Sequence, residues 1–228
     1  MHTDARPHDD ALKGILLTNA ITFAIALWQD WSVLQLMWPF WAQSLIIGWF
    51  ARQRILKLTQ FCTQGFRIND RSVDPTPETQ RQVANFFALH YGFFHFGYFA
   101  FLAIFTFTAD ASGTIMVTQG DSGIEAPVHI GTVHPIDFLI YAALSVAFWQ
   151  SHRASHLEHV QADLGNTPNI GTLMFMPYLR IIPMHICIIA AIPLGAGALW
   201  LFMLLKTGAD LLMHVVEHRV LQGRRAPS

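Results

Sequence analysis

The chain has 228 residues, of which 53% are hydrophobic and only 13% are charged. Soluble domains carry roughly 25% charged residues, so this composition excludes an ordinary soluble domain and indicates a polytopic membrane protein. The formal net charge of −1 at pH 7 argues against a nucleic-acid partner, because such partners are bound by basic surfaces.

Six apolar segments predict six transmembrane helices in a single all-α domain covering residues 1–228. The segments are residues 11–28, 33–55, 80–108, 135–160, 172–192 and 196–221. Thr76 and Pro77 have the residue types of a helix start, since threonine can cap the first turn and proline fits within it. Pro39 falls inside the second segment and is expected to kink it.

The basic residues are distributed unevenly between the predicted loops. A stretch rich in arginine and lysine, residues 52–81, joins the second and third segments, whereas the loop at residues 110–134 has neither. With six helices, both termini lie on the same side as the basic stretch. The positive-inside rule then predicts that both termini are cytoplasmic. Cys62 falls in the basic stretch and Cys187 in an apolar segment, so we expect no disulfide bond.

The last apolar segment carries ionisable residues at every fourth position, namely Lys206, Asp210, His214 and His218. On a helix, this spacing places them in one stripe. Ionisable groups at bilayer depth cost several kcal/mol and usually face a bundle interior or a water-filled cavity. We therefore expect the other helices to cover this stripe.

Histidines from other segments fall at a compatible depth, in the predicted cytoplasmic half. Imidazole is a ligand for zinc, iron and copper, and two histidines four residues apart offer two ligands on one helix face. We therefore predict a metal site, with zinc first and iron or copper next. Its predicted ligands are His90, His214 and His218, with His152 or His156 as further ones.

Packing or charge compensation offers another interpretation of several of these residues. Lys206 and Asp210 lie one turn apart and can neutralise each other. His156 and His159 can form a solvated face beside the membrane. A lone histidine on an apolar helix, such as His185, is usually a hydrogen-bonded packing residue.

Four motifs carry a resemblance to a known family. They are HYGFF at 90–94, SHRAS at 151–155, PYLRIIPMH at 177–185 and the stretch from Leu205 to His218. In this order, they resemble an uncharacterised bacterial integral-membrane family, a domain of unknown function, over nearly the whole chain. The resemblance implies a six-helix fold in the cell inner membrane and no particular activity. This chain has Gln43 and Ser44 where that family tends to have Glu and Asn.

A looser similarity connects the chain with the ceramidase and adiponectin-receptor membrane hydrolases. Those proteins pair an HxxxH motif on the last helix with an earlier histidine around a zinc ion. By this analogy, His214 and His218 would act with His90.

Several functions fit these features. One is a metal-dependent hydrolase of a membrane lipid or small amphiphile, with Asp210 or Glu217 as general base and Arg180 holding an anionic head group. A second is a proton or metal-ion transporter that uses Lys206, Asp210 and the histidines. A haem-binding electron-transfer protein with axial histidines, or a structural factor, is also open.

Overall fold

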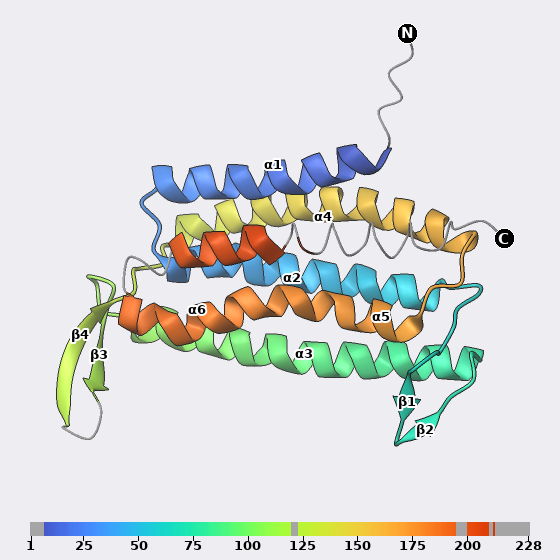
Figure 1. Cartoon of the computed structure of the whole chain (residues 1–228). Coiled ribbons are helices and arrows are strands. Elements are labelled where there is room, and N and C mark those ends of the chain that lie inside the picture. The colour runs from blue at the N-terminus through green and yellow to red at the C-terminus, as the bar shows by residue number, and fades with distance from the viewer. Residues whose placement is uncertain (1–6, 120–122, 195–199, 210–211, 213–228) are drawn as a thin grey trace, which may run out of the picture.

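The computed structural model describes residues 7–119, 123–194, 200–209 and 212, and its long helices lie side by side (Figure 1). The first four helices are α1 (Pro7–Trp28), α2 (Val33–Leu56), α3 (Pro77–Thr108) and α4 (Pro135–Leu164). Three shorter elements then form one uninterrupted rod. They are α5 (Ile170–Phe175), the 3-10 helix η2 (Met176–Arg180) and α6 (Ile181–Leu194). The residues Trp200–Ala209 are helical again.

These rods confirm the mostly helical fold with six helices that the sequence predicts, and the helix bounds differ by only a few residues. The predicted start of the third helix is also confirmed. The Thr76 side chain accepts a hydrogen bond from the Thr79 backbone N–H at 3.2 Å, and Pro77 is the first helical residue. Of the predicted sixth helix, only residues 200–209 and 212 lie within the described part of the chain.

By length and composition, α3 is the one helix among the described residues that could cross a membrane. Helices α2 and α4 are less apolar than α3 because they carry more polar residues. Helix α2 contains Gln35 and Gln43, and the second half of α4 contains Arg153, Glu158 and Asp163. The structure therefore shows a mostly helical fold with six helices, and six membrane spans stay a prediction.

Two short antiparallel hairpins interrupt the helical fold, and the sequence analysis expects loops at both places. Strands β1 (Arg67–Ile68) and β2 (Arg71–Ser72) pair before α3, and β3 (Thr114–Gln119) pairs with β4 (Ile124–His129) after it. At the base of the second hairpin, Gly131 has φ of +90° and lies against Ser32. Hydrogen bonds from Ser112 and Thr114 hold the pKa of Asp110 below its usual value.

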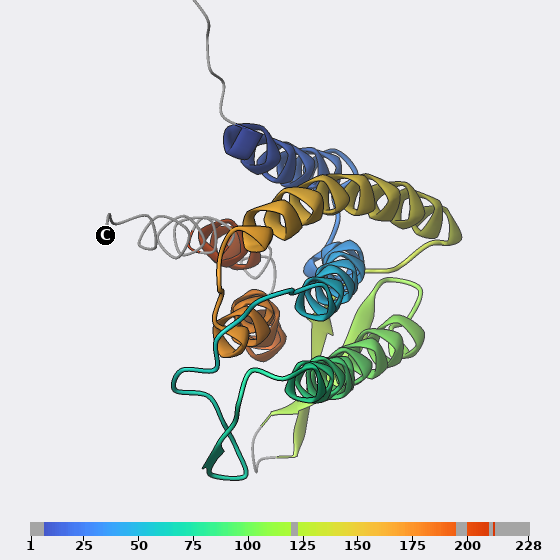
Figure 2. The same cartoon turned by 90° about the vertical axis from the view of Figure 1, so that its right-hand side faces the viewer.

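Helix α2 occupies the middle of the bundle. It packs against α3 on one side and α4 on the other, and α1 packs on α4 (Figure 2). Its apolar residues form much of the core, including Leu36, Met37 and Phe40, which are almost completely buried. Because α2 lies between α3 and α4, side chains of α3 are separated from side chains of α4 along most of the bundle.

The two ends of the bundle differ in charge. The end of α2, the β1–β2 hairpin, the start of α3 and the end of α4 lie together at one end, and the β3–β4 hairpin lies at the other (Figure 1). Basic residues gather at the first end, on α2, on the β1–β2 hairpin and at the start of α3. They are Arg52, Arg54, Lys57, Arg67, Arg71 and Arg81. We call this the basic end.

Candidate functional site

Four polar side chains meet inside the bundle, each from a different helix. They are Asn19 of α1, Gln43 of α2, His152 of α4 and Lys206 of the last helical stretch. All are buried: Gln43 is 2% exposed and Lys206 is 9% exposed. Burying polar groups costs free energy unless they are hydrogen-bonded, so a cluster of this kind needs a structural or functional reason. We call these four residues the Lys206 network.

The network is held together through the Asn19 amide oxygen. Lys206 Nζ donates to Asn19 Oδ1 at 3.2 Å, and Gln43 Nε2 donates to the same oxygen at 3.4 Å. Gln43 Nε2 also lies 3.2 Å from His152 Nε2. An amide nitrogen only donates, so His152 Nε2 is the acceptor in this arrangement. The amide of Gln43 therefore occupies one of the two ring nitrogens with which His152 could bind a metal.

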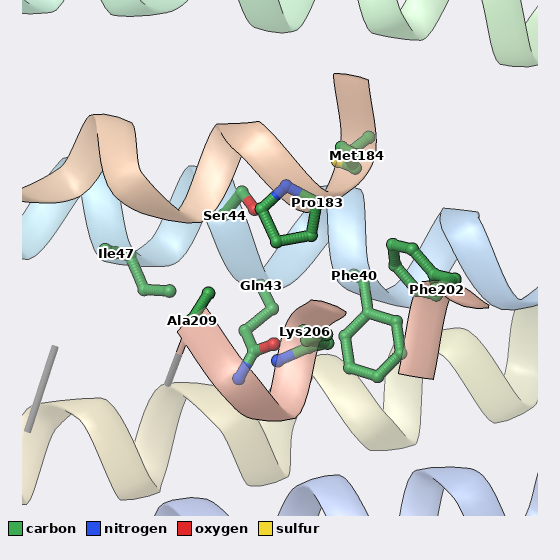
Figure 3. Close-up of a pocket in the computed structure, with 9 residues that line it drawn as sticks. All are labelled: Phe40, Gln43, Ser44, Ile47, Pro183, Met184, Phe202, Lys206 and Ala209. Atoms are coloured by element: carbon green, nitrogen blue, oxygen red, sulfur yellow. The ribbon is translucent and has the colours of Figure 1, made fainter. Parts of the chain in front are cut away.

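An aromatic ring completes the surroundings of the lysine. Lys206 Nζ lies 4.3 Å from the centroid of the Phe40 ring, a cation–π distance. The Gln43 amide and the Lys206 ammonium group point toward each other beside this ring (Figure 3). Among its described contacts, the lysine thus has an amide oxygen and an aromatic face inside a largely apolar core.

A small cavity of about 20 Å³ lies next to the network. Gln43, Ser44 and Lys206 contribute to its wall, and Pro183 and Met184 of α6 close its other side (Figure 3). This volume suits about one water molecule. The cavity therefore fits water or a similarly small species, and it is too small for a lipid head group.

Further along α4, the same helix face continues toward the basic end. The His156 ring lies 5.1 Å from the Phe50 ring of α2, and its Nδ1 atom is buried without a hydrogen-bond partner among the described residues. Asp163 forms a bidentate ion pair with Arg54, with distances of 2.7 Å from Nε to Oδ2 and 3.0 Å from Nη2 to Oδ1. Both of these charged side chains are largely buried.

His90 lies elsewhere. It is an exposed residue of α3, and its Nδ1 atom is 2.9 Å from the Tyr178 hydroxyl of η2. Its ring stacks on Phe86, with the centroids 5.3 Å apart. Because α2 stands between α3 and α4, the structure does not bring His90 together with His152 or His156.

Comparison with known protein families finds a match over almost the whole chain. A family of unknown function, DUF6498, matches residues 1–226. The chain belongs to this family. The prediction of a family of unknown function is thereby confirmed, and the match carries no link to a membrane or to hydrolase activity. No curated protein and no solved structure matches this DUF6498 member significantly.

Several predicted site residues of this DUF6498 member lie outside the described residues. They are Asp210, His214, Glu217 and His218. Arg180 is the last residue of η2, and its side chain lies outside the described part. Within residues 7–119, 123–194, 200–209 and 212, no three His, Cys, Asp or Glu side chains gather closely enough to hold a metal ion. The metal site with zinc, iron or copper therefore stays a prediction.

Sequence reasoning did not find Asn19 and Gln43 as site residues. It noted Gln43 only as a departure from the resembling family, and it did not mention Asn19. The available signal was weak: each is an amide within an apolar segment, a position that normally requires a buried partner. By contrast, the predicted packing role of His185 agrees with its contact, since its Nδ1 lies 2.6 Å from the Tyr98 hydroxyl.

Proposed function

We propose that this DUF6498 member spans the inner membrane with all six helices and transfers protons through the Lys206 network. The observation that carries the proposal is a lysine buried among amide groups contributed by other helices, next to a water-sized cavity. Ionisable groups inside membrane bundles commonly belong to proton or ion pathways. Lysine can release and regain a proton when buried, which is what such a step requires.

The distribution of side chains supports the membrane part of this proposal. Large apolar side chains point outward from several rods: Phe93 of α3 is 72% exposed, Leu139 of α4 is 67% exposed and Leu204 is 73% exposed. Polar side chains, including Gln43 and Lys206, are buried instead. A protein in water favours the opposite arrangement, whereas a bundle in lipid favours this one.

The size of the cavity favours proton transfer over hydrolysis of a lipid at the same place. A lipid head group needs a far larger pocket than the volume beside Lys206, which suits a single water. Water next to an ionisable side chain can take up or deliver a proton, which is one step of a proton pathway. The proposal therefore follows the transporter alternative of the sequence analysis, with the proton as the transported species.

The proposed topology has both termini and the basic end in the cytoplasm. Reporter fusions after Ser122, which lies between the β3 and β4 segments in the sequence, should read as external, and fusions after Gly223 should read as internal. A fusion after Gln60, at the basic end, provides the matched internal control. External readings at both Gln60 and Gly223 would contradict the proposed orientation. Release of the protein from membranes without detergent would contradict the membrane proposal itself.

Proton transfer can be measured with the purified protein in liposomes that contain a pH-sensitive dye, under an imposed potassium diffusion potential. The wild-type protein should acidify or alkalinise the interior faster than empty liposomes do. Lys206→Met should lower this flux by roughly tenfold or more, because it removes the ionisable group at the centre of the network.

Lys57→Met is the matched control, since Lys57 is an exposed lysine at the end of α2, outside the network. It should leave the flux unchanged. No wild-type flux above that of empty liposomes, or equal fluxes for wild type and Lys206→Met, would rule the proposal out.

A metal-dependent hydrolase is the second candidate, and one observation favours it. His152 and His156 are both buried and lie one helical turn apart, and the Nδ1 atom of His156 has no hydrogen-bond partner among the described residues. These imidazoles fit zinc, iron or copper, although Gln43 must first turn away from His152. A bound metal would supply an activated water. About one metal ion per chain in untagged protein, without proton flux, would favour this candidate.

A further inference from the structure

One face of α4 packs against one face of α2 from the Lys206 network to the basic end. Three side chains of α4 share this face, because their spacings of four and seven residues repeat on a helix. They are His152, His156 and Asp163. Their partners on α2 are Gln43, Phe50 and Arg54. We call this contact the α2–α4 seam.

The seam is more polar than packing between two helices requires. His156 is buried within it and has an unpartnered nitrogen among the described residues, and the neighbouring Ser155 is buried as well. A buried polar atom without a partner costs free energy, so an apolar residue would pack more favourably there. A passage for water accounts for these polar residues, because a water molecule that enters can form the missing hydrogen bonds.

Toward the other end of the bundle, the contact between α2 and α4 is closed by hydrogen bonds and aromatic packing. Gln35 donates to Asp137 at 3.2 Å, and the same carboxylate accepts from the backbone N–H of His134 at 2.8 Å. Beside them, the Trp31 and Tyr141 rings pack edge to face at 5.3 Å. Toward that end, the polar groups of α2 and α4 are hydrogen-bonded to each other, except for the buried Tyr141 hydroxyl, which has no hydrogen-bond partner among the described residues.

We propose that the α2–α4 seam is the route by which water reaches the Lys206 cavity from the basic end, and that the Arg54–Asp163 ion pair closes it. This inference rests on the proposed proton transfer. The ion pair lies at the end of the seam nearest the basic end, and its side chains are 12% and 6% exposed. Phe50, packed against His156, forms an apolar constriction between the ion pair and the network.

Thiol labelling tests the route without measuring any flux. In a background with Cys62→Ser and Cys187→Ala, Ser155→Cys places a thiol of similar size at the buried position next to His156 on α4. The protein is held in lipid nanodiscs and treated with a charged, water-soluble methanethiosulfonate reagent. The thiol should react slowly with the ion pair intact and roughly tenfold faster in the Arg54→Ala, Asp163→Ala background, because the shortened side chains leave space at the outer end.

A thiol on the same helix nearer the opposite end is the matched control. Ser145→Cys should stay at the background rate in both forms, because Ser145 lies beyond the cavity from the basic end. Should the double alanine variant fail to fold, Arg54→Lys keeps the charge, loses the bidentate contact and should accelerate labelling to a smaller extent.

The outcomes separate this inference from the proposed function. No labelling of Ser155→Cys in any background would overturn the route, even if wild-type liposomes conduct protons. Equal rates with and without the ion pair would overturn the closing role of Arg54 and Asp163. Accelerated labelling without proton flux in the wild type would keep the route and reject proton transfer.

Discussion

Replacing Arg54 by leucine is expected to lower the free energy of unfolding by about 3–5 kcal/mol, because it leaves the Asp163 carboxylate buried without its partner. The pair is bidentate and its side chains are only 12% and 6% exposed, so the remaining charge would be poorly solvated. Thermal or denaturant unfolding in detergent micelles, followed by circular dichroism, measures this loss.

The double variant Arg54→Leu, Asp163→Leu provides the control for this prediction. Removing both charges leaves no buried ion, so the double variant should be more stable than either single variant. A double variant as unstable as the sum of the two singles would show that the residues contribute independently. In that case, the Arg54–Asp163 ion pair would not hold the ends of α2 and α4 together.

A methyl group at Gly48 is expected to destabilise the bundle by about 1–3 kcal/mol, since it would overpack the contact between α2 and α3. The Cβ atom of Gly48→Ala would lie 2.5 Å from Cε1 and 2.8 Å from Cδ1 of Tyr91. This ring has little freedom to move away, because it is buried and its hydroxyl donates to the Ser44 carbonyl at 3.0 Å. The same unfolding measurement applies.

Gly97→Ala is the matched control on α3. A Cβ atom at Gly97 meets nothing within 4 Å, and alanine is a better helix former than glycine by roughly 0.5–1 kcal/mol. We therefore expect opposite signs, with Gly97→Ala neutral or stabilising and Gly48→Ala destabilising. Equal effects of the two changes would mean that Tyr91 does not pack against Gly48 as described.

The positions of the helices follow from local signals in the sequence. Apolar runs, the cap at Thr76 and the proline at residue 77 depend on neighbouring residues alone, so they can be recognised without knowing the fold. The gathering of basic residues at one end is equally readable, since it requires only the order of the helices. The β3–β4 hairpin was missed because its base depends on the contact of Gly131 with Ser32, far away in the sequence.

The stripe that begins at Lys206 is also determined by the sequence, because a four-residue spacing fixes which residues share a helix face. Which side chains meet that stripe depends on how each helix is rotated and placed in the bundle. Only the tertiary structure decided that Asn19 and Gln43 reach Lys206. His90 reaches Tyr178 instead, because packing puts α2 between α3 and α4 and thereby separates residues of similar predicted depth.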